Sequence, residues 1–538
     1  MFFSKNIFQR TIGILIILFG IVAVTLAILI TPAFAIKNLS PDHNLTLDGI
    51  RKLTSYRYIS SIVGILLIIC GSILMREKRY TRLPMIAFFV VLTIIYYQIW
   101  KVRTDLSDTA YFGGDTWEYQ SMGVNFAKGH GLQKFGALES FDTYRFENLN
   151  KSQRSYYARF ILEAGRDDFY RTPAYPLFLG IVYDLFGVNP KDAKALQLLM
   201  LVIIAASLPV IGYHYWGKVG FIGGIPAGGL YLAMNYTLAE EIMTEPLIAF
   251  SVFLVIVAQM VYEGRQRIIT ACLLGCTLGF ALLVKGTLIF LPILTFGLIL
   301  TNIVIKNNLG GQKRFLVILI STLLTVLPWS IYASIKSGEF IFLSTQSGSL
   351  LLDDNNELCI DGGWHKEWAE NKAAFYNNDG IDNNRVIEKV INFYWHHPAL
   401  FPRCMFAKFL QGFGPMPLLW IFMGFLLLGG MCRIIGRWVK SEFISNLTSI
   451  SLTQIPASFW VVGGNFLLIT LIFHAVGGLV VGSRNVAPMD FVFALLCCVS
   501  ALTFFSNIFR NINLKHRRGE YNCFHRLTKF LGEMLLLR

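Results

Sequence analysis

Apolar runs of about 20 residues recur along the whole chain, and this feature constrains the fold more than any other. Each run is long enough to cross the ~30 Å hydrocarbon layer of a bilayer as a helix. A closed barrel would need short strands of alternating polarity, whereas these runs are continuous. Only 15% of the residues are charged, against roughly 25% in an average soluble protein. The sequence therefore predicts an all-α polytopic membrane protein.

The hydropathy pattern predicts about 12 transmembrane helices, with boundaries good to a few residues. The predicted spans are 11–36, 57–75, 83–101, 195–215, 219–238, 243–262, 267–284, 286–306, 314–334, 414–435, 456–475 and 486–506. The first run is followed by the small-residue sequence TPAFA, as in a signal peptide, but its length favours an uncleaved helix.

Basic loops indicate which side of the membrane each segment occupies. The short loop REKRYTR (76–82) and the strongly basic tail are expected in the cytoplasm. Sides can be assigned by counting predicted helices forward from this loop or backward from the tail. The two counts agree only if segment 171–187, which contains two prolines, lies at the outer interface instead of crossing the membrane. We therefore expect both termini in the cytoplasm and two large segments outside.

This topology divides the chain into six parts. They are N-terminal transmembrane helices (1–101), a first outer loop with interfacial helices (102–194), central transmembrane helices (195–334), a small outer soluble lobe between late helices (335–403), C-terminal transmembrane helices (404–506) and a basic cytoplasmic tail (507–538). The expected location is the plasma membrane, and for a bacterial protein the inner membrane with the outer loops in the periplasm.

The net charge of +14 would suggest a nucleic-acid partner in a soluble protein. Here the basic residues gather in short loops and in the tail, as the positive-inside rule expects. We expect the lipid bilayer as a partner and no nucleic acid.

Several charged residues fall at or beyond the outer face, among them Asp115, Arg171, Glu241, Glu245 and Lys285. Any one of them could simply extend to water from the end of a helix. Charged groups that converge on one face of a membrane protein favour a functional site.

Short motifs link these residues in one order along about 380 residues. They are DTWEY (115–119) with NFAKGHGL (125–132), RTPAYPLFL from Arg171, MTEPL (243–247), LVKGTLIFLP around Lys285, LPWSIY (327–332), GEFIFLSTQSG (338–348), HHP from His396 and SRNVAP from Ser483. The set resembles the glycosyltransferase C superfamily. It is most similar to the branch that contains protein O-mannosyltransferases and the lipid A aminoarabinose transferase.

The resemblance implies an inverting membrane glycosyltransferase, transferring a hexose or a pentose. The implied donor is a sugar on polyprenyl phosphate, such as undecaprenyl phosphate. The acceptor would be a hydroxyl of a glycan or glycolipid such as O-antigen, of lipid A, or of a protein, as in lipopolysaccharide modification. No cofactor is implied. A divalent metal held by Asp115 and another acid is conceivable because hard cations favour oxygen ligands, but the branch does not generally require one.

Site residues follow from the matched motifs. We expect Asp115 to act as general base on the acceptor hydroxyl, although an isolated Asp at such a position could equally cap a helix. The other expected residues are Glu245 and Glu241 as further catalytic carboxylates, Arg171, Lys285 and Arg484 as ligands of the donor phosphate, and Tyr119, His130 and Tyr175 in the substrate pocket.

Two other classes of protein stay open. A transporter or flippase of lipid-linked sugars would usually contain two similar halves, and no internal repeat is evident. An O-antigen ligase or polymerase also spans the membrane many times, but we would expect its key Arg and His residues in a late loop.

Overall fold

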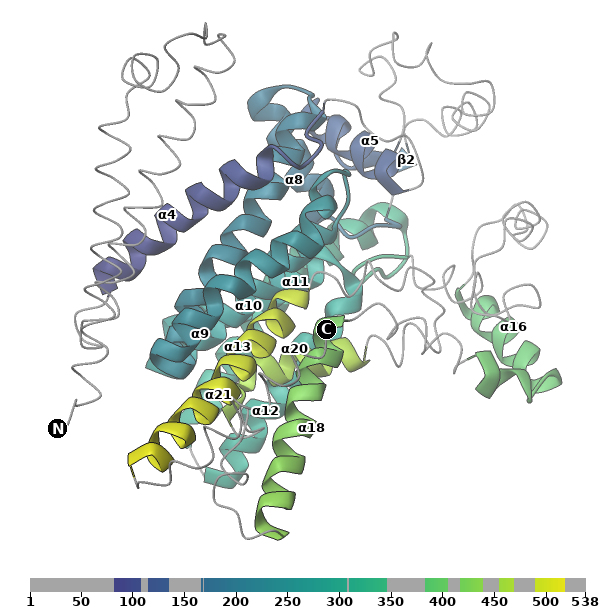
Figure 1. Ribbon diagram of the computed structural model, residues 1–538. Coiled ribbons are helices and arrows are strands. Elements are labelled where there is room, and N and C mark those ends of the chain that lie inside the picture. The colour runs from purple at the N-terminus through teal and green to yellow at the C-terminus, as the bar shows by residue number, and fades with distance from the viewer. Residues whose placement is uncertain are drawn as a thin grey trace, which may run out of the picture. The chain divides into compact units, whose positions relative to one another are not determined.

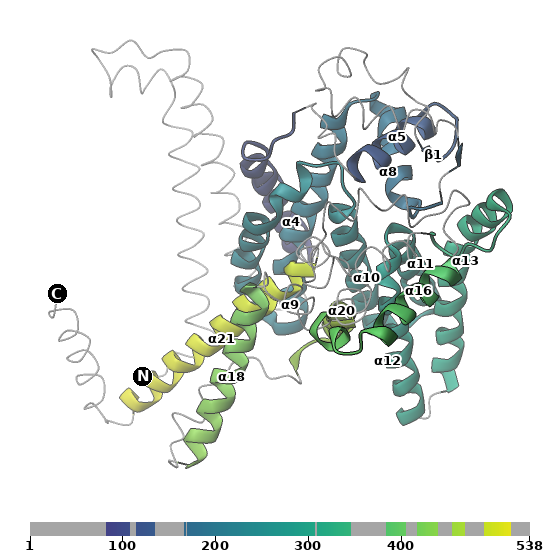
Figure 2. The same cartoon turned by 90° about the vertical axis from the view of Figure 1, so that its right-hand side faces the viewer.

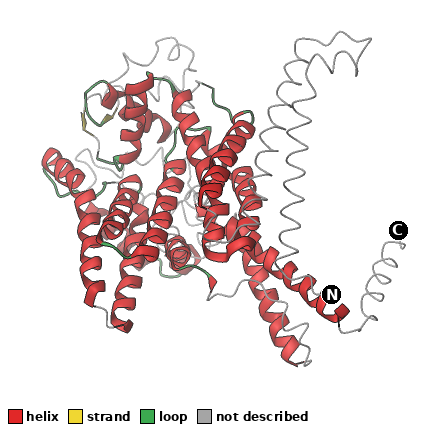
Figure 3. Cartoon of the chain, turned by 90° about the vertical axis from the view of Figure 1, so that its left-hand side faces the viewer, coloured by secondary structure: helices red, strands yellow, loops and turns green. Residues whose placement is uncertain are grey.

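The computed structural model describes a part of the chain that is almost entirely helical (Figures 1 and 3). This part comprises residues 82–107, 115–134, 166–167, 169–306, 309–345, 383–404, 417–438, 454–468 and 489–517. Its only strands are the two-residue β1 (Gln133–Lys134) and β2 (Arg166–Asp167), which pair antiparallel. Within the described residues the predicted all-α class is confirmed.

The helices follow the apolar runs of the sequence. They are α4 (Arg82–Lys101), α5 (Asp115–Ala127), α8 (Ala174–Phe186), α9 (Pro190–Asn235), η3 (Tyr236–Ala239), α10 (Glu245–Arg265), α11 (Ile268–Val284), η4 (Gly286–Ile289), α12 (Phe290–Lys306), α13 (Leu309–Ser337), α16 (Asn383–His396), α18 (Pro417–Trp438), α20 (Ala457–Leu468) and α21 (Asp490–Arg517).

Six of the described helical segments are long and apolar enough to cross a membrane. They are Leu83–Lys101, Pro190–Ala239, Glu245–Arg265, Gly286–Ile305, Gly310–Ser337 and Asp490–Asn507. The chain is therefore a multi-pass helical membrane protein. The predicted spans 11–36 and 57–75 lie outside the described residues, so the total of twelve stays a prediction.

Segment 171–187 contains only the 13-residue helix α8, which is about 20 Å long and thus shorter than the hydrocarbon layer. This length agrees with the prediction that the segment does not cross. The outer lobe is described only at its two ends, and residues 346–382 lie outside the described part. The lobe and the sidedness of the loops stay predictions.

The described chain forms two compact units, and the smaller one contains α4 and residues 202–236, which comprise most of α9 and the first residue of η3. Helix α9 is broken at Gly217, where φ is 61° and ψ is −140°, a conformation that favours glycine. The break separates the predicted spans 195–215 and 219–238. Gly220, Gly224 and Gly228 then face the preceding arm of α9, and a Cβ on Gly220 would lie 1.9 Å from the carbonyl oxygen of Gly212. The two arms therefore pack backbone against backbone.

The larger unit contains the remaining described helices. Helix α11 packs closely on α13, because a Cβ on Gly275 would lie 2.4 Å from the carbonyl oxygen of Ile318. Helix α5 joins the same unit through a buried apolar cluster. The cluster consists of Met122, Leu132, Trp329, Ala333 and Ile341. This packing fixes the first turns of α5 against the membrane helices of its own unit.

We predict that Gly220→Ala lowers the midpoint of thermal unfolding in detergent. The added Cβ meets backbone that cannot rotate away, and overpacking of this kind costs roughly 1–3 kcal/mol. Gly264→Ala is the matched control, since a Cβ at this helical glycine meets nothing within 4 Å. Equal midpoints for the two variants would contradict the close packing of the arms.

Candidate active site

Helices α5 and α8 lie side by side (Figure 2), and a glycine of each helix lies at their contact. A Cβ on Gly123 would lie 2.6 Å from the Cβ of Leu179, and a Cβ on Gly180 would lie 2.4 Å from Cδ1 of Phe126. Both glycines lie roughly two turns into their helices. This contact therefore brings the N-terminal ends of α5 and α8 together, although a long stretch of chain separates them.

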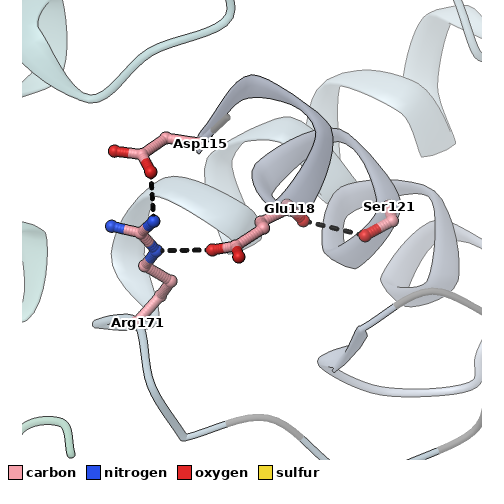
Figure 4. A network of polar contacts seen from close by, with 4 residues as sticks. All are labelled: Asp115, Glu118, Ser121 and Arg171. Carbon is pink, nitrogen blue, oxygen red and sulfur yellow. Dashed lines mark hydrogen bonds and ion pairs between the residues drawn. The ribbon is translucent and has the colours of Figure 1, made fainter. Parts of the chain in front are cut away.

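Three charged side chains meet at these helix starts (Figure 4). Nη2 of Arg171 donates a hydrogen bond to Oδ1 of Asp115, and Nε of Arg171 donates to Oε2 of Glu118 at 2.8 Å. The side chain of Arg171 is 7% exposed, that of Glu118 17% and that of Asp115 46%. Asp115 is thus the most exposed member of this carboxylate–arginine cluster.

Aromatic rings complete the surroundings of Arg171. Its guanidinium carbon lies 5.2 Å from the ring centroid of Tyr119 and 5.0 Å from that of Tyr170, distances at which a cation is attracted to a ring face. Tyr119 in turn contacts Tyr175 edge-on, with ring centroids 5.0 Å apart and planes at 87°. The ion pairs and the rings together hold the guanidinium in one orientation.

Electrostatics fixes the protonation states of Arg171 and Tyr119. Burial alone would lower the pKa of Arg171, but attraction by the phenolate that Tyr119 forms at high pH and by the carboxylates of Glu118 and Asp115 outweighs burial and raises this pKa well above its usual value. Burial also raises the pKa of Tyr119, more than the charge of Arg171 lowers it. At neutral pH Arg171 is therefore charged and Tyr119 is a neutral phenol.

A hydrogen-bond chain connects α8 to the start of α10. The hydroxyl of Tyr175 donates to Oε1 of Gln197 at 2.5 Å, and Nε2 of Gln197 donates to the backbone carbonyl of Glu241 at 2.7 Å.

Glu245, the first residue of α10, is 3% exposed. Its charge contributes to the raised pKa of both Tyr119 and Tyr175. The structure thus brings Glu245 and both predicted pocket tyrosines to one region, whereas Glu241 contributes its backbone.

Lys285 belongs to a turn next to this region. It ends α11 and precedes η4, and its side chain is half-buried. Oγ1 of Thr172 donates a hydrogen bond to the carbonyl of Val284 at 2.7 Å. The residue after Arg171 is thus bonded to the residue before Lys285, so the two predicted phosphate ligands stand on adjoining backbone.

One other predicted residue, His130, is not brought into the cluster. His130 is exposed in the turn after α5, between Gly129 and Gly131, which have φ values of 81° and 77°. Arg484 lies outside the described residues. Within the described ranges, no three His, Cys, Asp or Glu side chains are grouped so as to hold a metal ion.

Glu118 is the residue of the cluster that the sequence analysis missed. It lies three residues after Asp115, and this spacing places both carboxylates on one face of a helix. Recognition of the helix start at Asp115 would have indicated the pair.

No protein-family model matches the chain, and no curated protein matches it. Among solved structures, the crystal structure of ArnT from Cupriavidus metallidurans bound to undecaprenyl phosphate is 16% identical, and the alignment covers 78% of this chain and 77% of that chain. The TM-score is 0.33, which is too low to establish a common fold. The candidate site therefore has to be judged by its own geometry.

We predict that Arg171→Met destabilises the fold, because it leaves the largely buried carboxylate of Glu118 without its cation. The expected loss is roughly 1.5–3 kcal/mol, the range for hydrogen bonds to charged groups. Thermal unfolding midpoints in detergent would measure it. Arg171→Met combined with Glu118→Gln should lose less than the two single losses added together. Strictly additive losses would contradict a direct ion pair.

Proposed function

We propose that the chain is an integral membrane glycosyltransferase of the glycosyltransferase C type. In this proposal it moves a sugar from a polyprenyl-phosphate donor to an acceptor hydroxyl with inversion. The observation that carries the proposal is the cluster itself, in which a half-exposed Asp115 is held by the buried cation of Arg171. In such a pair Asp115 can act as a base on the acceptor hydroxyl, while Arg171 supplies a cation next to it for the leaving phosphate.

Asp115 suits the role of general base. An acceptor hydroxyl has a high pKa and must lose its proton as it attacks, and a positioned carboxylate accelerates this step by roughly 10²–10⁴-fold. Arg171 binds Oδ1 of Asp115, and the contacts found among the described residues leave Oδ2 available to take the proton. The acceptor oxygen would attack the sugar from the face opposite the phosphate, which inverts the anomeric centre.

The leaving group needs cations, because polyprenyl phosphate gains charge as the bond to the sugar breaks. Arg171 uses Nε and Nη2 for the two carboxylates, and its described contacts do not involve Nη1. Lys285 is joined to Arg171 through the bond between Thr172 and Val284. A phosphate bound by Nη1 and by the Lys285 ammonium would gain charge-assisted hydrogen bonds.

The motif resemblance supports the same proposal from another direction. Tyr119, Tyr175 and Glu245 belong to three separate motifs of the sequence. In the structure Tyr175 and Glu245 lie near Tyr119, whose ring contacts the guanidinium of Arg171. Such convergence is expected of residues that share one substrate. In this reading Glu245 orients the sugar or the acceptor.

The proposed setting is the outer, periplasmic face of a bacterial inner membrane. The acceptor would be O-antigen or another glycolipid, lipid A, or a protein. Incubation of the purified protein with a polyprenyl-phosphate sugar and each acceptor class tests the reaction class directly. Release of polyprenyl phosphate together with a glycosylated acceptor supports a transferase. Movement of intact donor across a vesicle membrane without release would instead indicate a flippase.

We predict that Asp115→Asn lowers kcat by a factor of roughly 10²–10⁴, the contribution of a general base. The amide keeps the shape of the carboxylate and still accepts a hydrogen bond from Arg171, so the unfolding midpoint should change little. Asp184→Asn is the control, because Asp184 is an exposed acid of α8. Activity of Asp115→Asn within a few-fold of wild type would rule out Asp115 as the base.

We predict that Lys285→Ala raises the KM for the donor and lowers kcat, since the phosphate is bound more strongly as it gains charge. Arg171→Ala should act in the same direction with a larger loss of kcat, because Arg171 also holds Asp115. If both cations bind one phosphate, the double variant loses less than the two single losses combined. Steady-state kinetics with varied donor measures these effects. Unchanged donor kinetics in both single variants would exclude a shared phosphate site.

A further inference from the structure

We propose that Glu118 is a positioning residue for the transfer reaction. It acts through Arg171, by occupying Nε of the guanidinium and thereby keeping Nε and Nη2 from binding both oxygens of Asp115. The inference rests on the function proposed above and adds a residue to it.

The contacts of Arg171 are unusual for a buried arginine beside an aspartate. Nε and Nη2 point to the same side of a guanidinium and normally bind the two oxygens of a single carboxylate. Here the two donors are divided, since Nε binds Glu118 at 2.8 Å and Nη2 binds Asp115 (Figure 4). Asp115 is consequently held through one oxygen only.

This division has a chemical consequence for the proposed base. A carboxylate bound through both oxygens is neutralised by the arginine and is a weak base. A carboxylate bound through one oxygen keeps its second oxygen for the acceptor proton. Glu118 therefore allows one arginine to orient Asp115 without using up its basic site.

The burial of Glu118 supports such a role. Its side chain is 17% exposed, compared with 46% for Asp115, so it is the less suited of the two acids to contact a substrate. The rings of Tyr119 and Tyr170 contact the guanidinium and restrict its tilt. The rotation of the guanidinium within its own plane is then set by which oxygens bind Nε and Nη2.

Tyr119, Tyr175 and Glu245 are further ionisable groups near the pair. Tyr119 and Tyr175 are neutral phenols because burial raises the pKa of each, and Glu245 adds one buried carboxylate from α10. Arg171 is the cation that both Asp115 and Glu118 contact. The division of its hydrogen bonds thus controls how far Asp115 is neutralised.

The test compares Glu118→Ala in two backgrounds, wild type and Arg171→Lys. In the wild-type background kcat should fall about tenfold, which is less than the roughly 10²–10⁴-fold contribution of a general base because Asp115 itself is still present, with less than about a twofold change in the donor KM. Glu118→Gln should keep most of the activity, because its amide oxygen still accepts a hydrogen bond from Nε. In the Arg171→Lys background, Glu118→Ala should change kcat by less than about twofold, because an ammonium has no paired donors to divide.

A tenfold loss in both backgrounds would overturn the inference, and so would an unchanged kcat per folded molecule in Glu118→Ala. If Glu118→Ala does not fold, Glu118→Asp replaces it in the same comparison, since its shorter side chain withdraws the carboxylate from Nε. Asp184→Asn again serves as the control for an exposed acid. Turnover by the wild-type protein is measured in the same assay. If the wild-type protein shows no turnover, the proposed function is contradicted. If the wild-type protein turns over normally but Glu118→Ala has the same effect in both backgrounds, only the role of Glu118 is contradicted.

Discussion

One buried guanidinium joins the two helices on which the candidate site is built. Arg171 stands just before α8, and both of its carboxylate partners stand in the first turn of α5. A buried charge is strongly unfavourable unless it is paired and hydrogen-bonded. The two carboxylates therefore stabilise the buried charge of Arg171. In the proposed function the same pairing sets where a substrate would meet a base and a cation.

Small residues make this arrangement possible. Gly123 and Gly180 let α5 and α8 approach until any Cβ at their contact would collide with the opposite helix. Farther along, the bond from Thr172 to Val284 ties the same segment to the turn that carries Lys285. Glycines that look unremarkable in an apolar sequence thus set the distances between charged groups that are far apart in the chain.

Hydropathy predicted most of the described helices, including the pair of spans that meet at Gly217. It did so because span length depends on bilayer thickness alone. The convergence of Tyr119, Tyr175 and Glu245 could be expected from their motifs. The role of Glu118 could not be expected from the sequence. It depends on a helix that starts at Asp115 and on which carboxylate accepts the hydrogen bond from Nε of Arg171. Such details arise from tertiary packing, which periodicity does not encode.

The central claim is that Arg171 serves a base and a leaving phosphate at once. A cryo-electron microscopy structure of the Asp115→Asn variant with a bound polyprenyl-phosphate sugar tests it most directly. The donor phosphate should lie within hydrogen-bonding distance of Nη1 of Arg171 and of the Lys285 ammonium, with the anomeric carbon facing residue 115. A donor whose phosphate is bound by other cations, away from Arg171, would contradict the account.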